Sequence, residues 1–576
     1  MGLHREKMNF IKIVTGLFIT CWFSFSGAAA EKTQSRDTTK RNDAPGIPHL
    51  EKRGSATQLI VKGQPFLVLG GELHNSSATS PAYMKPIWKK LTDMHLNTVL
   101  AVVSWELSEP EEGKYDFSLV DSLLVNARKN NLHLALLWFG SWKNGLSHYA
   151  PAWVKKDYKR FPRMRIKGGF PVEALTPFSN ETMNADTKAF AAFMKHVKQA
   201  DEREQTVIMI QVQNEVGLLG DSRDRSALAD KAFNQPVPKE LISHLVKNKE
   251  TLLPEMLQLW ATKGFRTTGT WPDIFGNTPA AEEAFMAWQY ARFMNKMTEA
   301  GKAEYPLPMF VNAWIVQPED QQPGDYPTGG PQSHVHDIWR AGAPAIDILA
   351  PDIYLPNFDD ITALYTRSDN VLFVPESRAD ERGAANAFYA IGQHKAIGYS
   401  PFGIEDRVED PVNGPLPKSY DVLQQLAPQI LAAQNRNAIA GVWLNATKQK
   451  KTIELGGYSL HAELRRSRRV VPTDAAQEAG YGLVINTGPD EFIIAGKNIQ
   501  VNFFPTTPGP AYVGYAEVDE GKYNNGKWVA GRRLNGDDIM LNYNMASEAA
   551  IQKTGTVIRV PVTAPGILHV KLYRFE

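Results

Sequence analysis

The chain of 576 residues is too long for a single compact core, and typical domain sizes of about 100–200 residues predict two or three domains. A hydrophobic fraction of 43% and a charged fraction of 22% are those of a soluble globular protein. The formal net charge of +1 gives no electrostatic reason to expect nucleic acid as a partner.

The N-terminus has the pattern of a secretory signal peptide. Basic residues precede an apolar run at 13–25, and small residues at 27–30 provide a cleavage site. We therefore expect residues 1–30 to be removed and the protein to be periplasmic or secreted, with an uncleaved membrane anchor as the alternative. The single cysteine, Cys21, lies inside this segment, and its lipidation is left open. No later apolar run is long enough to span a bilayer, so no membrane span is expected after cleavage.

Strand-like and helix-like segments alternate after a polar stretch, residues 31–54, which we interpret as a flexible lead-in. Amphipathic segments with apolar residues at i, i+3, i+4 and i+7 separate short buried strands. Eight such units predict a closed (β/α)8 TIM barrel over residues 55–430, with an open doubly wound sheet as the alternative. The eight predicted strands are 66–70, 98–103, 132–139, 206–214, 308–313, 346–354, 371–376 and 396–403.

Two connections, 141–187 and 217–280, are longer than a simple loop requires. Both follow the carboxyl end of a predicted strand, where insertions would wall a substrate pocket. After residue 430 the pattern changes to short alternating segments separated by Gly, Asn and Asp. Residues 431–576 are therefore expected to form a β-rich, sandwich-like accessory domain.

Two of the predicted strands end in glutamate, at Glu215 after Asn214 and at Glu376 after Pro375. A TIM barrel gathers the carboxyl ends of its strands at one mouth, and its chemistry lies there. Cleavage of a glycosidic bond needs two carboxyl groups, one protonated and one ionised. The pair therefore predicts a glycoside hydrolase. Further carboxylates expected at the same mouth are Glu72, Asp352 and Glu405.

Several separated motifs resemble the family 35 β-galactosidases, which belong to a clan of retaining (β/α)8 glycosidases. They are GGELH at 70–74, NTV at 97–99 followed by WELSEPEEGKYDF at 105–117, and PAW at 151–153. The C-terminal β region is similar to the accessory domain of bacterial members, so the resemblance covers about residues 55–576.

This resemblance implies roles for individual residues. Glu215 would be the general acid/base and Glu376 the nucleophile, while Asn214 would hold the sugar 2-hydroxyl and Tyr354 would donate to Glu376. Glu72 and Asn144 are implied to bind hydroxyl groups of the sugar. Candidates for the floor of the pocket are Trp105, Trp138, Trp142 and Trp314.

The sequence also departs from the family. Asn75–Ser77 follow His74 where the family has Tyr and a spaced Arg, and Gly140–Ser141 precede Trp142 where it has Ala-Glu. These departures affect the prediction of which sugar is bound more than the prediction of which reaction is catalysed.

The expected function is thus a retaining exo-β-galactosidase that removes terminal β-D-galactosyl residues from oligosaccharides, with plant cell-wall side chains as a candidate source. One alternative is another retaining β-glycosidase, such as a β-glucosidase, a β-mannosidase or an arabinopyranosidase-like enzyme. The other is a carbohydrate-binding barrel without activity. No cofactor or metal is expected, because His74, His95, His133 and His148 form no ligand cluster in the sequence.

Overall fold

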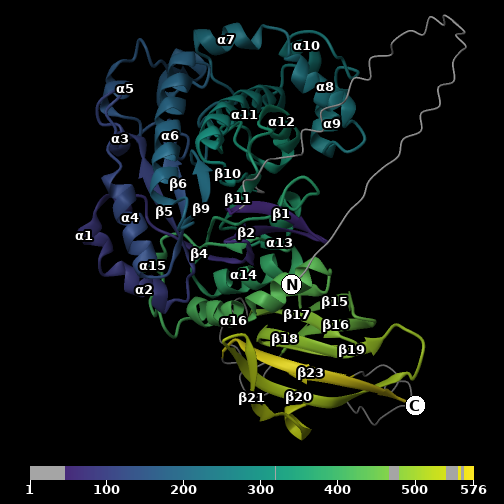
Figure 1. Ribbon diagram of the computed structural model, residues 1–576. Helices are drawn as coiled ribbons and strands as arrows, with labels where there is room; N and C mark the ends of the chain where they lie inside the picture. Colours follow the sequence, from purple (N-terminus) through teal and green to yellow (C-terminus); the bar gives the residue numbers. More distant parts are fainter. Residues whose placement is uncertain (1–45, 318–319, 466–478, 540–555, 560–563) are drawn as a thin grey trace, which may run out of the picture. The chain divides into compact units, whose positions relative to one another are not determined.

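The computed structural model describes residues 46–317, 320–465, 479–539, 556–559 and 564–576 (Figure 1). The predicted signal peptide and Cys21 lie outside these residues, as does most of the predicted lead-in. The last part of the lead-in is not flexible, because it forms a strand, β1 (His49–Arg53). Across the described ranges, no helix combines the length and apolar character needed to cross a bilayer.

All eight predicted barrel strands are present, and they form one parallel sheet. Val374 bridges to Tyr399 and thereby closes the sheet between its first and last strands. Pro375 has no N–H to donate, which accounts for the two-residue length of the seventh strand. In barrel order the strands are β13 (Gly398–Tyr399), β4 (Val68–Glu72), β5 (Thr98–Ser104), β6 (His133–Phe139), β9 (Val207–Val212), β10 (Met309–Trp314), β11 (Ile348–Ile353) and β12 (Glu376–Ser377).

A small antiparallel sheet covers the amino-terminal end of the barrel. It consists of β1, β2 (Ala56–Val61) and β3 (Gln64–Phe66). Leu59 and Val61 join the apolar cluster inside the barrel, beside residues near the strand starts such as Ile348. Burial of these side chains excludes water from that end, which leaves the opposite, carboxyl end as the face where TIM barrels carry their functional side chains.

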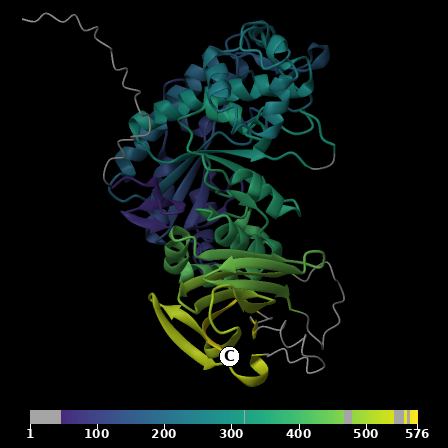
Figure 2. The same cartoon turned by 90° about the vertical axis from the view of Figure 1, so that its right-hand side faces the viewer.

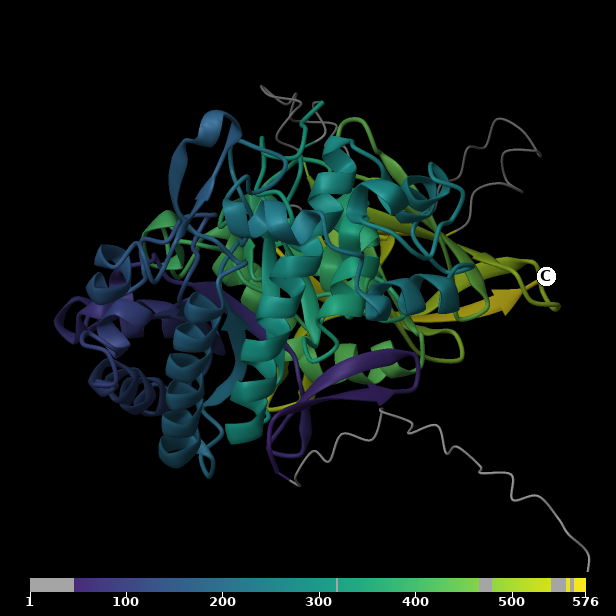
Figure 3. The ribbon, with the colours of Figure 1, turned by 90° about the horizontal axis from the view of Figure 1, so that it is seen from above.

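Each barrel strand is followed by a helix that packs on the outside of the sheet. Helices α6 and α11 lie side by side, as the view from above shows (Figure 3). The helix predicted around Met84–Leu91 is interrupted at Pro86 and forms two short helices. The helices are α1 (Pro81–Met84), α2 (Ile87–Asp93), α4 (Ser118–Lys129), α6 (Asn180–Asp201), α11 (Pro279–Glu304), α12 (His336–Gly342), α13 (Phe358–Tyr365), α14 (Glu381–Gln393) and α16 (Pro415–Asn435).

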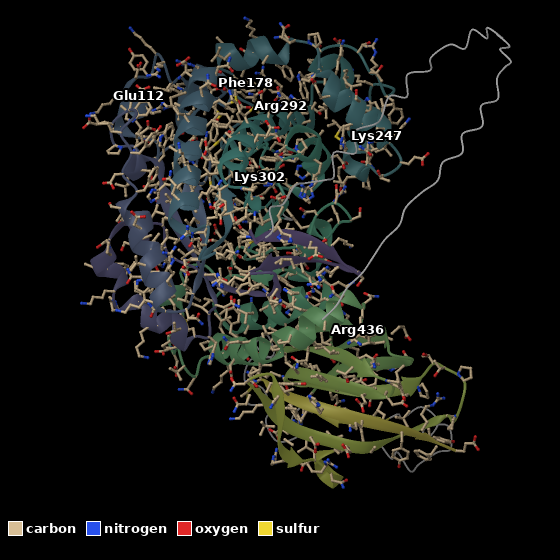
Figure 4. All side chains as sticks on the ribbon, viewed as in Figure 1. Glu112, Phe178, Lys247, Arg292, Lys302 and Arg436 are labelled. Carbon is tan, nitrogen blue, oxygen red and sulfur yellow. The ribbon has the colours of Figure 1, made fainter. Side chains whose placement is uncertain are left out.

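The two long connections are ordered insertions on the carboxyl side of the barrel. Phe178, labelled in Figure 4, stacks on Phe285 of α11 with ring centroids 4.9 Å apart, and so fixes the first insertion to the barrel. The first insertion holds α5 (Ala152–Lys156), β7 (Arg163–Arg165) and β8 (Pro171–Leu175), and the second holds α7 (Ala227–Phe233), α8 (Lys239–Lys247), α9 (Pro254–Ala261) and α10 (Trp271–Phe275).

The C-terminal region contains two antiparallel sheets that share one apolar core, as expected for a sandwich (Figure 2). Helix α16 runs through the predicted domain boundary at residue 430. One sheet is β14 (Ile439–Leu444), β17 (Gly480–Gly488), β18 (Glu491–Lys497), β23 (Gly566–Phe575), β20 (Tyr512–Asn524) and β21 (Lys527–Arg533), and the other is β15 (Lys450–Leu455), β16 (Tyr458–Leu464), β19 (Ile499–Pro505) and β22 (Thr556–Arg559).

Helix α14 of the barrel packs closely against this sandwich. Its Gly392 faces Gly441 of β14, and a Cβ atom at Gly441 would lie 2.7 Å from the backbone nitrogen of Gln393. Phe388 of α14 contacts Tyr481 of β17, with ring centroids 5.4 Å apart. Because side chains of both regions belong to one buried cluster, barrel and sandwich share part of their core.

Candidate active site

Four of the five carboxyl groups that the sequence predicts at the barrel mouth lie together, buried, at the carboxyl ends of the strands. Glu72 ends β4, Asp352 lies near the end of β11, Glu376 starts β12 and Glu215 follows β9. Asp352 and Glu376 are direct partners on neighbouring strands. One oxygen from each of Glu215, Asp352 and Glu376 lies within 4.8 Å of the others. The two glutamates of the sequence pair therefore meet in space.

Three donors surround the Glu376 carboxyl group. The Tyr354 hydroxyl donates to it at 3.0 Å, and the side-chain amides of Asn214 and Asn312 donate at 3.3 and 3.4 Å. Burial and the neighbouring Glu376 raise the pKa of Tyr354, so its hydroxyl keeps its proton. An ionised carboxylate can accept all three bonds, which suits Glu376 to act as a nucleophile.

Glu215 has the properties of a carboxylic acid that is protonated near neutral pH. Burial, followed by repulsion from Glu376, raises the pKa of Glu215 to about 7. The Lys143 ammonium, 3.9 Å away, and a hydrogen bond from the Asn144 amide oppose this rise. The Glu215 backbone N–H donates to the Asn312 side chain at 3.0 Å.

The two remaining carboxyl groups favour the neutral form. Burial and the charge of Glu376 raise the pKa of Glu72 and of Asp352 well above the usual range. Asp352 accepts a hydrogen bond from the Asn312 amide at 2.7 Å. Neither carboxylate oxygen of Glu72 has a partner among the described residues, although its side chain is completely buried. Such a group is an unused donor and acceptor beside the site.

Lys143 supplies a positive charge among these acids. Burial acts to lower the pKa of Lys143, but Glu376, Glu215 and the two further carboxyl groups outweigh it and raise the pKa. A protonated Lys143 therefore balances one ionised carboxylate, and the other three acids remain neutral at moderately acidic pH. This balance avoids the large cost of several uncompensated buried charges.

A buried hydrogen-bond network positions the loop that carries Lys143 and Asn144. Gln213 accepts from the Trp142 backbone N–H at 3.0 Å and donates to Asp186 of α6 at 2.7 Å. Asp186 also accepts from Trp138 and from both the backbone and the hydroxyl of Ser141. The loop is thus tied to the chain segment that carries Glu215.

The backbone at the site is held in left-handed conformations. Gln213, Glu215 and Asn144 have φ values of +63°, +44° and +51°. Each such residue costs on the order of 1–3 kcal/mol and persists only where surrounding contacts fix it. These contacts include the backbone bond from Gly145 N–H to the Glu215 carbonyl at 3.1 Å. In these conformations the side chains of Asn144 and Glu215 meet in a hydrogen bond.

Two further residues predicted to bind the sugar, Asn214 and Trp314, lie in different surroundings. Asn214 lies at the mouth, and its buried Oδ1 has no partner among the described residues. Trp314 ends β10 as the register partner of Asp352 and, unlike the other three predicted tryptophans, is only half-buried.

Three tryptophans do not floor the pocket. Trp105, Trp138 and Trp142 are completely buried, and each indole N–H donates to the protein, so none can stack on a sugar.

Glu405 lies in α15 (Ile404–Arg407), where it accepts from Ser77 and from the His74 backbone.

The sequence reading missed Lys143 and Asn312 as site residues. Lys143 stands in the Trp142–Asn144 stretch directly after a barrel strand, which is the signal that marked the glutamates. Asn312 is a polar residue inside the apolar strand β10, two positions before Trp314 and hence on the same face. Its amide bridges Asp352 and Glu376.

Glu215, Asp352 and Glu376 have the spacing of a possible cation site. The Lys143 ammonium beside Glu215 already supplies a positive charge there, which disfavours a bound divalent cation. The four histidines considered in the sequence contact four different partners: His74 contacts Asp406, His95 contacts Asp421, His133 contacts the Gln205 carbonyl, and His148 contacts Glu173.

Two family models match the chain. Residues 76–305 match Glyco_hydro_42, described as β-galactosidase, and this segment includes Glu215. Residues 416–546 match DUF5597, a domain of unknown function. The barrel and the first match support a glycoside hydrolase. Membership of family 35 is not confirmed, because the matching barrel model is of the family 42 type.

Two curated proteins are similar over short segments. Beta-galactosidase 13 of Arabidopsis thaliana is 26% identical over 222 residues, which are 37% of this chain and 24% of that protein. A beta-galactosidase of Xanthomonas manihotis is 39% identical over 62 residues, or 11% and 10% of the respective chains. The chain thus matches a quarter or less of the length of these relatives.

Solved structures of glycosidases are similar to this chain only at low TM-scores. The beta-galactosidase from Bacillus circulans sp. alkalophilus has a TM-score of 0.43 and 13% identity, over 88% of this chain and 99% of its own. The beta-galactosidase from Rahnella sp. R3 has a TM-score of 0.42 and 16% identity, over 63% and 56%. Both TM-scores lie below 0.5, so neither likeness bears on function.

Proposed function

We propose that the protein is a retaining exo-β-galactosidase that hydrolyses terminal non-reducing β-D-galactosyl residues of oligosaccharides. The observation that carries the proposal is the meeting of Glu215 and Glu376, with carboxylate oxygens within 4.8 Å of each other. Retaining glycosidases separate their two carboxyl groups by about 5–5.5 Å, whereas inverting enzymes leave about 6.5–9.5 Å for a water molecule. The short separation favours direct attack by a carboxylate.

In the first step, a Glu376 oxygen attacks the anomeric carbon from the face opposite the leaving group. The glycosidic C–O bond breaks, and Glu215 transfers its proton to the departing oxygen. The aglycone leaves as an alcohol, and the sugar is held as an ester of Glu376. With a pKa of about 7, Glu215 is mostly protonated for this step below neutral pH.

In the second step, Glu215 removes a proton from water, and the resulting oxygen attacks the anomeric carbon. The ester bond breaks and returns the electron pair to Glu376. While Glu376 is esterified, its negative charge is absent, and one of the causes that raise the pKa of Glu215 disappears. The pKa of Glu215 then falls, which suits its role as a base.

Galactose is favoured by the β-galactosidase description of the family that matches residues 76–305 and of both curated relatives. Glu72, Asn144, Asn214 and Trp314 are proposed to contact the sugar. The unpartnered oxygens of Glu72 and of Asn214 are suited to hydroxyl groups of a bound sugar.

A panel of nitrophenyl glycosides tests the proposal. Hydrolysis should be fastest for the β-D-galactoside, compared with the β-D-glucoside, β-D-mannoside and α-L-arabinopyranoside. Proton NMR during the first minutes should show β-galactose as the initial product. A faster rate on another glycoside would change the assigned sugar, an α-anomer would contradict retention, and binding without hydrolysis would indicate an inactive carbohydrate-binding barrel.

A further inference from the structure

A second cavity, of about 550 Å³, lies where the barrel meets the sandwich. The barrel lines it with Pro356, Arg378 and Arg382, and the sandwich lines it with Trp443 and the β14–β15 turn at Asn445–Thr447. This volume is within the range of about 300–1,000 Å³ that is usual for ligand pockets. None of these residues belongs to the carboxylate site.

The chain connects this cavity directly to the carboxylate site. Pro356 follows Tyr354 by two residues, and Arg378 follows Glu376 by two residues. Tyr354 and Glu376 share a hydrogen bond in the candidate active site. The cavity therefore lies beside the strands that carry the proposed nucleophile and its donor.

The sandwich turn is fixed on this side of the barrel. Lys448, directly after the lining residue Thr447, forms an ion pair with Asp359 in the first turn of α13. The Asn445 side chain accepts from the backbone N–H groups of Thr447 and Lys448, at 2.9 and 2.8 Å, and so holds the turn in shape. Lys497 of β18 contacts Glu381 at the start of α14. These contacts make the cavity preorganised for a ligand.

The lining suits a neutral ligand with many hydroxyl groups. The half-buried Trp443 presents an indole whose N–H donates to no described residue. The exposed Arg382 guanidinium likewise makes no hydrogen bond within the described part of the chain. Arg378 is paired with Asp380 at 2.5 Å, so the cavity carries charges of both signs. An aromatic face with a few free donors is typical of a site for a sugar ring.

We propose that this cavity binds the aglycone, the sugar residues on the leaving-group side of the bond that is cleaved. The inference rests on the proposed function and assigns Trp443 as a stacking platform and Arg382 as a hydroxyl ligand. In an exo-acting enzyme the terminal sugar fills the barrel mouth, and the rest of the oligosaccharide must lie along an adjoining surface. The sandwich thus contributes to substrate choice without touching the reacting atoms.

Kinetics on two kinds of substrate test this assignment. Trp443→Ala should raise KM for β-1,4-galactotetraose and for galactosylated oligosaccharides from plant cell walls by about tenfold. The same variant should leave kcat/KM for nitrophenyl β-D-galactoside within about twofold of wild type, because that aglycone is too small to need the cavity. Trp443→Phe should retain part of the affinity. An equal change on both substrate types, or no change on the oligosaccharides, would overturn the proposal.

Two further variants separate binding from folding. Arg382→Ala removes an exposed side chain and should raise KM for the oligosaccharides alone, with an unchanged Tm. Tyr573→Ala, which removes an exposed aromatic ring elsewhere on the sandwich, is the matched control and should change neither KM. An effect of Tyr573→Ala equal to that of Trp443→Ala would indicate a general disturbance of the sandwich and contradict the cavity assignment.

Calorimetry distinguishes failure of this inference from failure of the proposed function. In the background of Glu376→Gln, galactotetraose should bind about tenfold more weakly when Trp443 is replaced by Ala. If wild-type protein hydrolyses no galactoside, the proposed function fails; binding that still depends on Trp443 would then show a sugar site that is not an aglycone site. If hydrolysis occurs but the affinity for galactotetraose does not depend on Trp443, only the present inference fails.

Discussion

The Lys143 ammonium lies 3.9 Å from the Glu215 carboxylate, and both side chains are almost completely buried. This pair sets the charge balance of the candidate site. Burial, followed by repulsion from Glu376, raises the pKa of Glu215 to about 7, and the Lys143 charge opposes this rise. The position of the Lys143 side chain therefore favours the ionised form of Glu215 and of Glu72, against burial and the charge of Glu376.

Replacing Lys143 by Met should lower kcat and move the alkaline limb of the pH profile to higher pH. The sign follows from the charge: loss of a nearby cation destabilises the Glu215 carboxylate, so its pKa rises and the acid form persists to higher pH. Rates at several pH values on nitrophenyl β-D-galactoside measure both effects. Lys143→Arg retains the charge and is the control. An alkaline limb that moves to lower pH in Lys143→Met would contradict the assignment.

The wild-type enzyme should lose activity above about pH 7. Glu215 must be protonated to assist the leaving group, and above its pKa of about 7 the acid fraction falls about tenfold for each pH unit. The measurement is kcat/KM from pH 4 to 9 on a substrate with a poor leaving group. A flat profile between pH 7 and 9 would argue against Glu215 as the acid.

Glu215→Ala should impair hydrolysis of substrates with poor leaving groups far more than that of dinitrophenyl galactoside in its first step. A good leaving group departs without a proton, so glycosylation no longer needs the acid. Azide should restore turnover and yield β-galactosyl azide. An equal loss of glycosylation for good and poor leaving groups would refute the role.

Glu376→Gln should abolish turnover for all leaving groups, because no ester can form. Azide should not restore a β-configured product, since its attack would occur on the free substrate from the opposite face. Glu405→Gln is a useful comparison, because Glu405 is also a buried carboxyl group that follows a barrel strand, but it lies in α15 and contacts Ser77 and the His74 backbone. It should retain activity if the protein folds.

Tyr354→Phe removes the hydroxyl that donates to Glu376 at 3.0 Å. A hydrogen bond to a charged group contributes about 1.5–3 kcal/mol, which corresponds to a loss of roughly 10–100-fold in kcat. The Tm should change little, because Tyr354 is 36% exposed. Unchanged kcat would show that the two remaining amide donors suffice.

Asp186→Ala should destabilise the fold and remove activity together. It leaves the donors of Trp138, Ser141 and Gln213 without their buried acceptor, at an expected cost of about 3 kcal/mol or more in the free energy of unfolding. Urea unfolding measures this cost, and kcat reports the displaced Lys143 loop. Asp186→Asn preserves the shape and should lose less stability. Full activity of Asp186→Ala would show that the loop is held by other contacts.

The strand pattern predicted all eight barrel strands and the sandwich, because buried strands carry a strong local signal in their apolar runs. The strand-end rule also predicted that Glu72, Glu215, Asp352 and Glu376 gather at one mouth. The rule could not distinguish Glu405 from these four residues, because Glu405 shares their local pattern, although its carboxyl group contacts Ser77. The family resemblance offered Trp105, Trp138 and Trp142 as candidates for the pocket floor, although all three are buried in the core.

The sequence by itself determined the barrel, the paired glutamates and the class of reaction that they suggest, since each depends on a residue type and its place along a strand. Only the tertiary structure decided that Lys143 and Asn312 join the glutamates, and that Trp443 of the sandwich lies beside the barrel. Those relations arise where segments distant in the chain approach one another, and no local pattern encodes such a distance.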